Sequence, residues 1–286
     1  MSIKVENVFY TYMEKTPYQV DALKDISFEI QDGEFVGIVG HTGSGKSTLI
    51  QIISGLLPGY RGKVLINDTD YSGKKADKNA LRRTLGVVFQ YPEYQLFEET
   101  VEKDISFGPK KLGMKDDEIA ERVKKAMELV DLDYEKYKDV SPFQLSGGQK
   151  RKVAIAGVLA MDPKILILDE PIAGLDPQGR ENFLELIKGL NQEGLTIIMV
   201  SHNMDNLVEY ADRMIVLKDG ELFMDGTPAE VFADKEKVYE ASLDLPEVAS
   251  FCERLRERGF EVPEGIIKYE QLKKYLTETL GGKVDG

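Results

Sequence analysis

The chain has 286 residues, of which 50 are acidic and 37 basic, and its net charge is −13 at pH 7. An acidic chain is not drawn to phosphate backbones, so this charge disfavours DNA or RNA as the main partner. No apolar run approaches the roughly 20 residues of a membrane span. One cysteine excludes an internal disulfide and two histidines are too few for a usual zinc site, which favours a globular protein of the reducing cytosol.

The first part of the chain predicts three strands and a helix. Residues 3–9 and 22–30 are expected as strands, the second because apolar and polar residues alternate along it. A loop is expected at 12–18 between them. The apolar run 35–39 predicts a third strand, and a helical pattern begins at residue 48.

A glycine-rich segment, residues 40–47, joins this third strand to the helix. Gly40, Gly45, Lys46 and Ser47 stand at the spacing of a phosphate-binding loop. In such a loop the backbone N–H groups and the helix N-terminus surround a polyphosphate, the lysine reaches the β- and γ-phosphates, and the hydroxyl holds Mg²⁺. A glycine turn that binds nothing would leave the lysine and the hydroxyl unexplained, so the segment predicts nucleotide binding.

The middle of the chain predicts a change from strands to helices. In chain order we expect strands at 64–66 and 85–89, an irregular segment with two prolines at 91–112, and helices at 117–131 and 148–161. The first of these helices is expected because its apolar residues fall on one face.

Two continuous apolar runs, 164–168 and 195–200, have the composition of strands buried on both faces of a parallel sheet. A helix is expected between them, from the cap Asp176 to Gly194. Residues 214–224 predict a hairpin around an Asp-Gly turn. Strands that alternate with helices indicate an α/β fold with a mainly parallel core, to which the N-terminal strands and the hairpin add antiparallel pieces.

Two apolar stripes at helical spacing follow residue 230. The first consists of Val248, Phe251, Cys252 and Leu255 and is stopped by Gly259; the second consists of Leu272, Tyr275, Leu276 and Leu280 and is stopped by Gly281. Helical spacing leaves two interpretations open: the stripes pack on the chain's own core, or they face a partner.

Polar side chains stand where the predicted strands end, which is where open α/β sheets bind ligands. Asp169 fits as the partner of Ser47 in holding Mg²⁺, and Glu170 could orient or deprotonate a water. Gln90 and His202 end two other strands and could reach the γ-phosphate or the attacking water. Carboxylates at strand ends also cap helices, and a lone glutamine or histidine there is often structural.

A second glycine-containing helix start, Leu-Ser-Gly-Gly-Gln at 145–149, offers a further set of phosphate-binding donors. By itself it could also be an ordinary cap.

With this segment the set of motifs resembles that of the ATP-binding cassette (ABC) ATPases, in family order over residues 3 to about 230. The resemblance implies an ABC ATPase fold: a parallel core, an antiparallel β-subdomain and a helical subdomain. It implies ATP and Mg²⁺ as cofactors. The D-loop departs at Ala173-Gly174, where many cassettes have Ser-Ala or a similar pair, but it retains Asp176.

The resemblance also assigns roles to residues. Catalytic roles fall to Glu170, His202 and Gln90, and Mg²⁺ is held by Ser47, Gln90 and Asp169. Adenine stacks on Tyr12. The phosphates of the chain's own ATP are bound by Gly40, Thr42, Gly43, Ser44, Gly45, Lys46, Ser47 and Thr48, and the ATP of a partner by Ser146, Gly148 and Gln149.

A narrower resemblance is to the ATPases of energy-coupling factor (ECF) transporters, which power uptake of vitamins and of cobalt or nickel ions. The segments that carry it are 90–97, 100–102 and 107–109, and the tail from 243–246 is similar to the family's C-terminal extension. Thr16-Pro17-Tyr18 and the Gly40-His41-Thr42-Gly43 variant resemble the second of the two ATPase types in that family.

This resemblance implies an organisation and partners. We expect an ATPase domain at 1–230 with a helical subdomain at about 91–162, and a helical extension at 231–286 that serves dimerisation. The partners would be a second ATPase subunit, in a homo- or heterodimer, and a transmembrane coupling subunit that docks near 91–112, with a substrate-binding membrane subunit contacted indirectly. The chain would lie at the cytoplasmic face of the cell membrane. The alternatives are the ATPase of another ABC importer, a non-transport ABC ATPase, and a kinase or nucleotide-dependent binding module with an incidental Ser-Gly-Gly turn.

Overall fold

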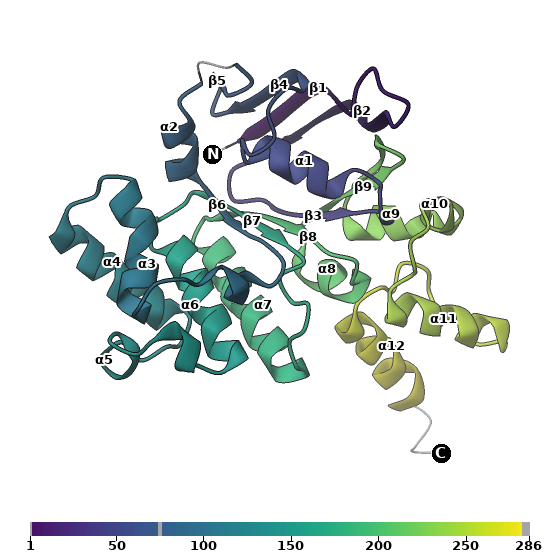
Figure 1. Ribbon diagram of the computed structural model, residues 1–286. Coiled ribbons are helices and arrows are strands. Elements are labelled where there is room, and N and C mark those ends of the chain that lie inside the picture. The colour runs from purple at the N-terminus through teal and green to yellow at the C-terminus, as the bar shows by residue number, and fades with distance from the viewer. Residues whose placement is uncertain (1, 74–75, 282–286) are drawn as a thin grey trace.

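Two β-sheets organise the computed structural model, which describes residues 2–73 and 76–281 (Figure 1). The larger sheet has six strands in the order β10-β9-β3-β8-β7-β6. Neighbours from β9 to β6 are parallel, whereas β10 is antiparallel to β9. The six strands are Phe35–Val39 (β3), Leu85–Val88 (β6), Ile165–Asp169 (β7), Thr196–Val200 (β8), Arg213–Lys218 (β9) and Glu221–Gly226 (β10).

The smaller sheet is antiparallel, with the order β2-β1-β4-β5. Its strands are Ile3–Tyr12 (β1), Val20–Ile30 (β2), Arg61–Ile66 (β4) and Thr69–Asp70 (β5). The expectation that Tyr12 opens a loop is wrong, because Tyr12 pairs with Val20 and is the last residue of β1. The strand therefore gives this aromatic ring a fixed position.

Both faces of the parallel sheet are covered, as the continuous apolar runs predicted. In β3, Phe35 and Val39 belong to one buried cluster, and Val36 and Ile38 belong to the other. The second cluster also holds the antiparallel strands and α1 (Lys46–Ile53), so α1 lies between the two sheets (Figure 1). The same alternation in β7 and β8 makes the sheet a rigid base for side chains at its strand ends.

Helices cover the other face and extend to one side, where α3 to α6 gather (Figure 1). The helices of that side are the 3-10 helices η1 (Pro92–Gln95) and η2 (Pro142–Gln144) and the α-helices α3 (Val101–Lys111), α4 (Asp116–Leu129), α5 (Tyr134–Tyr137) and α6 (Gly147–Leu159). The long helix α7 (Pro177–Gln192) follows β7 and has Asp176 as its cap, as predicted.

The prediction that residues 91–112 are irregular is wrong, because η1 and α3 lie there. The Thr100 hydroxyl caps α3 by accepting from Lys103 N. Val101, Ile105 and Pro109 stand four residues apart and are all buried. Pro109 lies in the last turn of α3. There, the free energy gained by burying these three side chains outweighs the loss of the backbone hydrogen bond that a proline cannot donate.

Short α-helices escaped the periodicity analysis: α5, given above, and α2 (Lys78–Thr84), α8 (Met204–Tyr210), α9 (Pro228–Ala233) and α10 (Lys235–Glu240). They are too short to show a repeat of 3.6 residues. Their caps were the available signal, because Asp77, Asn203, Thr227 and Asp234 each accept from a backbone N–H two or three residues on.

The two C-terminal stripes lie on α11 (Glu247–Glu257) and α12 (Tyr269–Gly281) and pack against each other. Cys252 and Leu272 are buried in this small cluster, whereas Phe251 is exposed. The side chain of Leu280 lies outside the part that the structure describes. The extension meets the body where Glu247 N donates to Asp205 Oδ1 at 2.7 Å.

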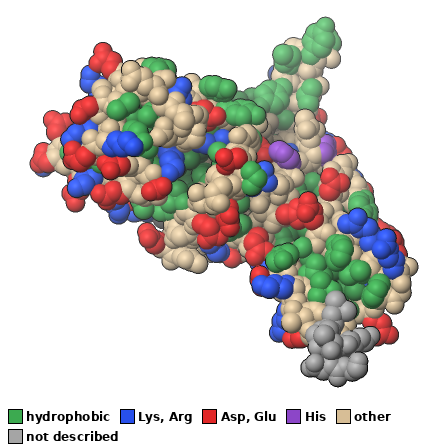
Figure 2. Space-filling model, turned by 90° about the horizontal axis from the view of Figure 1, so that it is seen from below, with side chains coloured by type: hydrophobic (Ala, Val, Ile, Leu, Met, Phe, Trp, Pro, Cys, Tyr) green, Lys and Arg blue, Asp and Glu red, His purple; other side chains and the backbone are tan. Residues whose placement is uncertain are grey.

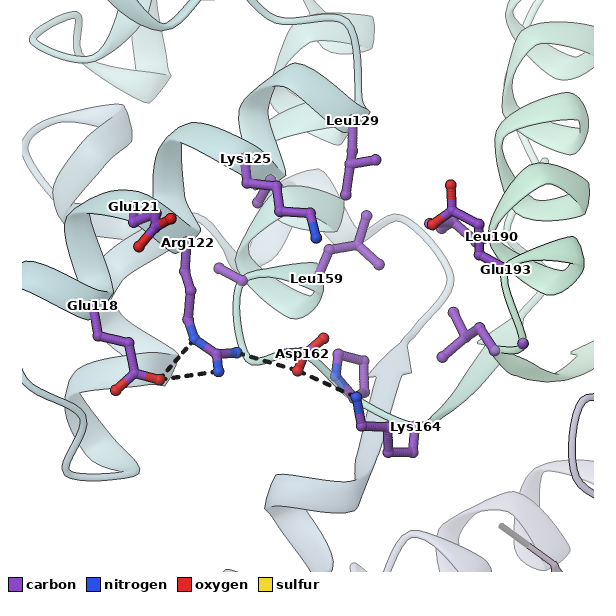
Figure 3. Close-up of a pocket in the computed structure, with 15 residues that line it drawn as sticks. Glu118, Glu121, Arg122, Lys125, Leu129, Leu159, Asp162, Lys164, Leu190 and Glu193 are labelled. Atoms are coloured by element: carbon purple, nitrogen blue, oxygen red, sulfur yellow. Dashed lines mark hydrogen bonds and ion pairs between the residues drawn. The ribbon is translucent and has the colours of Figure 1, made fainter.

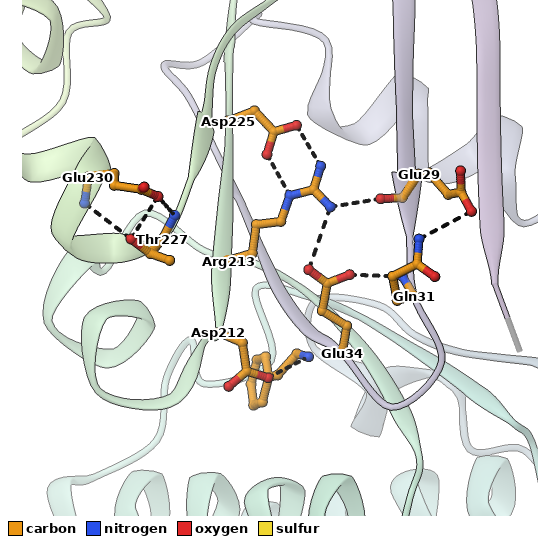
Figure 4. A network of polar contacts seen from close by, with 9 residues as sticks. Glu29, Gln31, Glu34, Asp212, Arg213, Asp225, Thr227 and Glu230 are labelled. Atoms are coloured by element: carbon orange, nitrogen blue, oxygen red, sulfur yellow. Dashed lines mark hydrogen bonds and ion pairs between the residues drawn. The ribbon is translucent and has the colours of Figure 1, made fainter.

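Arg213 of β9 joins the two sheets (Figure 4). Its guanidinium contacts both oxygens of Asp225, at 2.5 and 2.6 Å, and donates to the carbonyl of Glu29 at 2.7 Å. Glu34 Oε1 lies 3.5 Å away. The bidentate pair with Asp225 holds β9 and β10 together, and the bond to the Glu29 carbonyl joins this hairpin to β2.

Among residues 2–73 and 76–281, the structure contains no helix of the length and apolarity that a bilayer crossing requires.

Candidate active site

The loop between β3 and α1 has a backbone that only glycines allow. Gly43 and Gly45 have φ of +86° and +105°, in the left-handed region, and a Cβ on Gly40 would lie 2.2 Å from the carbonyl oxygen of Leu217. Gly45 is the N-cap of α1 and provides no side-chain hydrogen bond. The first N–H groups of α1 are therefore available to an anion, which the positive end of the helix dipole also attracts.

Lys46 is folded over this loop. Its Nζ donates to the carbonyls of Gly40 at 2.5 Å and His41 at 2.9 Å. Burial lowers the pKa of Lys46, while the carboxylates of Glu170 and Asp169 act in the opposite direction and raise it. The fold thus brings the predicted lysine and the two predicted carboxylates into one electrostatic site, although they lie far apart in the sequence.

The carboxylates stand at the end of β7, which β8 separates from the phosphate-loop strand β3. Burial raises the pKa of Asp169, and repulsion by Glu170 raises it further, while Lys46 lowers it. A half-buried carboxylate under these conditions favours a nearby cation. Asp169 pairs with Val200 in β8, so its position is fixed by the sheet.

Glu170 and His202, both expected at strand ends, are in contact, which the sequence analysis did not predict. His202 Nδ1 lies 2.8 Å from Glu170 Oε1. Glu170 has φ of +48° and donates its N–H to the carbonyl of Val200 at 2.9 Å. A left-handed conformation is costly for a residue with a Cβ and marks places where the surroundings determine the backbone. The loop thus directs the Glu170 carboxylate towards His202.

The predicted metal residues supply only oxygen donors. Ser47 is exposed in the first turn of α1, Asp169 is half-buried, and Gln90 is exposed just beyond β6. In the described ranges, no three His, Cys, Asp or Glu side chains form a metal cluster. A hydroxyl, one carboxylate and an amide fit Mg²⁺, which takes few protein ligands and completes its shell with water and substrate phosphates.

Tyr12 lies at the edge of the phosphate loop. Its OH is 3.2 Å from the hydroxyl of Thr48 in α1, and its ring meets Tyr10 edge-on at 4.8 Å. The ring is 37% exposed. A half-exposed aromatic ring held next to the helix N-terminus is suited to stacking on a base.

The hairpin turn after β9 belongs to the site, which the sequence analysis missed. Gly220 N donates to the carbonyl of Ser44 at 3.2 Å, and Asp219 Oδ1 lies 3.4 Å from His41 Nε2. The sequence showed the Asp-Gly pair only as a turn.

The segment at 145–149 makes its contacts within the helical side of the molecule. Ser146 Oγ accepts from Gln149 N at 3.3 Å, and Gln149 Oε1 accepts from Ser146 N at 3.0 Å, which is a capping box. The Gln149 amide also donates to Tyr137 OH at 2.9 Å. Ser146 and Gly148 are exposed, and a Cβ on Gly148 would meet nothing within 4 Å.

A hollow of about 450 Å³ between α4, α7 and the end of α6 contains none of the predicted site residues (Figure 3). Four of the charged groups that line it pair with one another: Arg122 contacts Glu118 at 3.0 Å and Asp162 at 3.6 Å, and Lys164 contacts Asp162 at 3.2 Å.

Comparison with known proteins agrees with this geometry. The family model described as "ABC transporter" matches residues 23–173. The "Energy-coupling factor transporter ATP-binding protein EcfA2" of Clostridium perfringens is 54% identical over 98% of this chain and 99% of its own. The protein of the same name from Clostridium tetani is 51% identical over 99% of each chain.

Solved structures show the same fold. CbiO1 from Clostridium perfringens, described as part of the ABC transporter complex cbiONQ, is 41% identical, with a TM-score of 0.73 over 88% of this chain and 98% of its own. The cassette MJ0796, in a dimeric post-hydrolysis state bound to ADP and Pi, is 32% identical, with a TM-score of 0.70 over 79% of this chain and 98% of its own. The chain therefore belongs to the ABC transporter family, among its energy-coupling factor ATP-binding proteins.

Proposed function

We propose that this chain binds and hydrolyses ATP to power an ECF importer for vitamins or transition-metal ions, as one half of an ATPase pair. The observation that carries this proposal is that different residues surround the N-termini of α1 and α6. Next to the start of α1 lie Lys46, Asp169 and Glu170, which influence one another's ionisation, whereas the start of α6 is exposed and closed by its own capping box.

Each residue of the chain's own site has a role in this proposal. The N–H groups of α1 and the amine of Lys46 bind the phosphates, and the Lys46 contacts to loop carbonyls are exchanged for phosphate oxygens. Ser47, Asp169 and Gln90 would hold Mg²⁺, which would supply positive charge beside the phosphates.

The reaction itself needs a water with a proton acceptor beside it. Glu170 accepts the proton of the attacking water, and His202, which is 2.8 Å from Glu170, orients the carboxylate. Tyr12 stacks on adenine at the edge of the loop.

Pairing supplies the remaining donors. Ser146 and Gly148 would face the ATP held by the second subunit, because both residues are exposed at the start of α6 and open space surrounds Gly148. Nucleotide then adds contacts that exist only in the closed pair and shifts the equilibrium towards it, and hydrolysis removes them. The dimeric ADP-bound state of the related cassette supports this arrangement. The extension at 231–286, on which hydrophobic side chains gather (Figure 2), contributes to association.

Docking to a transmembrane coupling subunit is assigned to residues 91–112. Tyr94 is 84% exposed, and Phe97 packs edge-on against Phe107 at 4.9 Å while both remain exposed. Aromatic rings grouped on a surface are typical anchors of protein interfaces. Through this contact the chain would lie at the cytoplasmic face of the cell membrane, next to a substrate-binding subunit that it does not touch.

The test is purification of the tagged chain from membranes. We expect an integral membrane protein and a second ATPase subunit to co-purify with it. Tyr94→Ala and Phe97→Ala should lose the membrane protein while soluble ATP hydrolysis persists. Phe143→Ala removes an exposed aromatic ring outside this segment and serves as the control. Unchanged co-purification and transport in both docking variants would refute the assignment of residues 91–112.

A further inference from the structure

Arg151 of α6 places a charged side chain inside the molecule, in a position that the roles described so far do not use. The side chain is 5% exposed. Its Nη1 donates to the carbonyl of Ala173 at 2.8 Å, and its Nη2 donates to the carbonyl of Pro171. Both carbonyls lie in the loop directly after Glu170. A planar guanidinium that binds two carbonyls fixes that loop relative to α6.

Glu93 of η1 approaches the same guanidinium from the proposed docking segment. Glu93 Oε2 lies 4.0 Å from Arg151 Nη1, and the glutamate side chain is 18% exposed. Glu93 Oε2 and Arg151 Nε are both buried without a hydrogen-bond partner. Burial lowers the pKa of Arg151, and Glu93 acts in the opposite direction. A buried carboxylate oxygen without a donor depends on the cation beside it.

A second contact joins the docking segment to the loop after Glu170. Tyr91 has φ of +55° although it precedes Pro92, and a following proline disfavours helical conformations. Gly174 has φ of +77°, and a Cβ on it would lie 3.5 Å from Cε1 of Tyr91. The Tyr91 ring thus lies against the backbone of the loop that Arg151 holds, at the position where the D-loop departs from the usual pair.

We propose that Arg151 is a positioning residue for hydrolysis, which joins the start of α6, the loop at 171–175 and the docking segment into one unit. A shift of the docked membrane subunit then moves Glu93 and Tyr91 and, through Arg151, the backbone that orients Glu170. This inference rests on the proposed docking role of residues 91–112.

The experiment compares Arg151→Lys with the unchanged chain by hydrogen exchange and by hydrolysis. Lysine keeps the charge but cannot hold two carbonyls with a rigid fork. We expect amide exchange to become faster in peptides covering 91–97 and 171–175. The exchange rate of the phosphate loop at 40–47 should stay the same. ATP affinity and KM should stay the same while kcat falls on the order of 10- to 100-fold, because misplacement of a catalytic group costs this much.

Arg122→Lys is the matched control, since Arg122 pairs with Glu118 and Asp162 at the surface of α4. It should change neither exchange nor kcat. If Arg151→Lys does not melt cooperatively, Glu93→Gln carries the test, with faster exchange at 91–97 and a lower kcat at unchanged KM.

Two results would overturn the proposal: faster exchange in one of the two segments alone, or a kcat equal to that of the unchanged chain. These readouts are taken on the chain with the ATPase that pairs with it, without the membrane subunit. A failure of the docking assignment appears instead in the co-purification of Tyr94→Ala and Phe97→Ala, so the two failures are distinguishable.

Discussion

The start of α1 and the start of α6 both contain glycines and a serine, yet the structure equips them differently. At α1 the cap is Gly45, which makes no side-chain hydrogen bond and leaves the first N–H groups to a ligand. At α6 the cap is Ser146, whose hydroxyl and backbone are bonded to Gln149. The α1 start leaves its first N–H groups to a ligand, whereas at α6 the N–H groups of Ser146 and Gln149 are bonded to each other's side chains.

The two helix starts also differ in the residues that surround them. Lys46, Asp169 and Glu170 influence one another's ionisation next to α1. No Cβ position on Gly147 or Gly148 of α6 has a neighbour within 4 Å, so the α6 start presents an open surface. This difference is what the proposed function requires, in which the α1 start binds the chain's own ATP and the α6 start completes the site of a second chain.

The largest expected effect is that of Glu170→Gln. The amide keeps the shape of the side chain but cannot accept the water's proton, so kcat should fall about 10²- to 10⁴-fold. ATP binding should persist, and the variant should accumulate as a closed pair in Mg·ATP. Single-turnover hydrolysis and analytical ultracentrifugation measure the two consequences.

Glu181→Gln is the control for that experiment, because Glu181 is an exposed carboxylate on α7. It should hydrolyse ATP at the normal rate. Full activity of Glu170→Gln would remove Glu170 from its role, and a monomeric variant in saturating Mg·ATP alongside its cognate ATPase would contradict the shared site.

Gly148→Asp tests the role of the α6 start without changing the α1 start. The new carboxylate would face the partner's phosphates, where like charges cost several kcal/mol, so hydrolysis by the pair should fall about 100-fold. Binding of ATP to the isolated chain should not change. An acidic residue in the first turn favours the helix dipole, and open space surrounds the site, so the fold should tolerate it.

Gly189→Asp, in open space on α7, provides the matched control for the added charge. Normal hydrolysis by Gly148→Asp would show that α6 does not face a nucleotide.

The two helix starts were also unequally predictable. The phosphate loop could be found from sequence because its glycines, lysine and hydroxyl are needed at fixed local spacing, and the apolar runs around it gave β3, β7 and β8 correctly. The sequence placed Glu170 and His202 at strand ends, but their contact required the strand order, which was not predicted.

What could not be predicted depends on contacts between distant segments. The role of Asp219 and Gly220 at the phosphate loop requires the hairpin to fold back onto it, and nothing local encodes this. Helix α3 was missed because two prolines in 91–112 outweighed a short apolar stripe, and only packing against the core decides between them.

Lys46→Ala should weaken nucleotide binding rather than the chemical step. Loss of hydrogen bonds from a charged donor costs about 1.5–3 kcal/mol, which is about 10- to 150-fold in Kd. Fluorescence titration with an ATP analogue measures the change. Lys152→Ala, which removes an exposed lysine of α6, should bind normally, and an unchanged Kd for Lys46→Ala would contradict the assignment of the loop.

Tyr12→Ala should have the smallest effect, because it removes a stacking surface and leaves the phosphate contacts intact. An aromatic contact of this kind contributes about 0.5–1.5 kcal/mol, so Kd for ATP should rise about 2- to 13-fold. Tyr12→Phe keeps the ring but loses the contact to the Thr48 hydroxyl, and it should bind like the unchanged chain. If both variants bind equally weakly, the hydroxyl contact with α1 matters and the ring does not, which would move Tyr12 from the base site to the support of the phosphate loop. Triphosphate carries no base to stack on Tyr12, so its binding should not differ between Tyr12→Ala and the unchanged chain, whereas binding of ATP should.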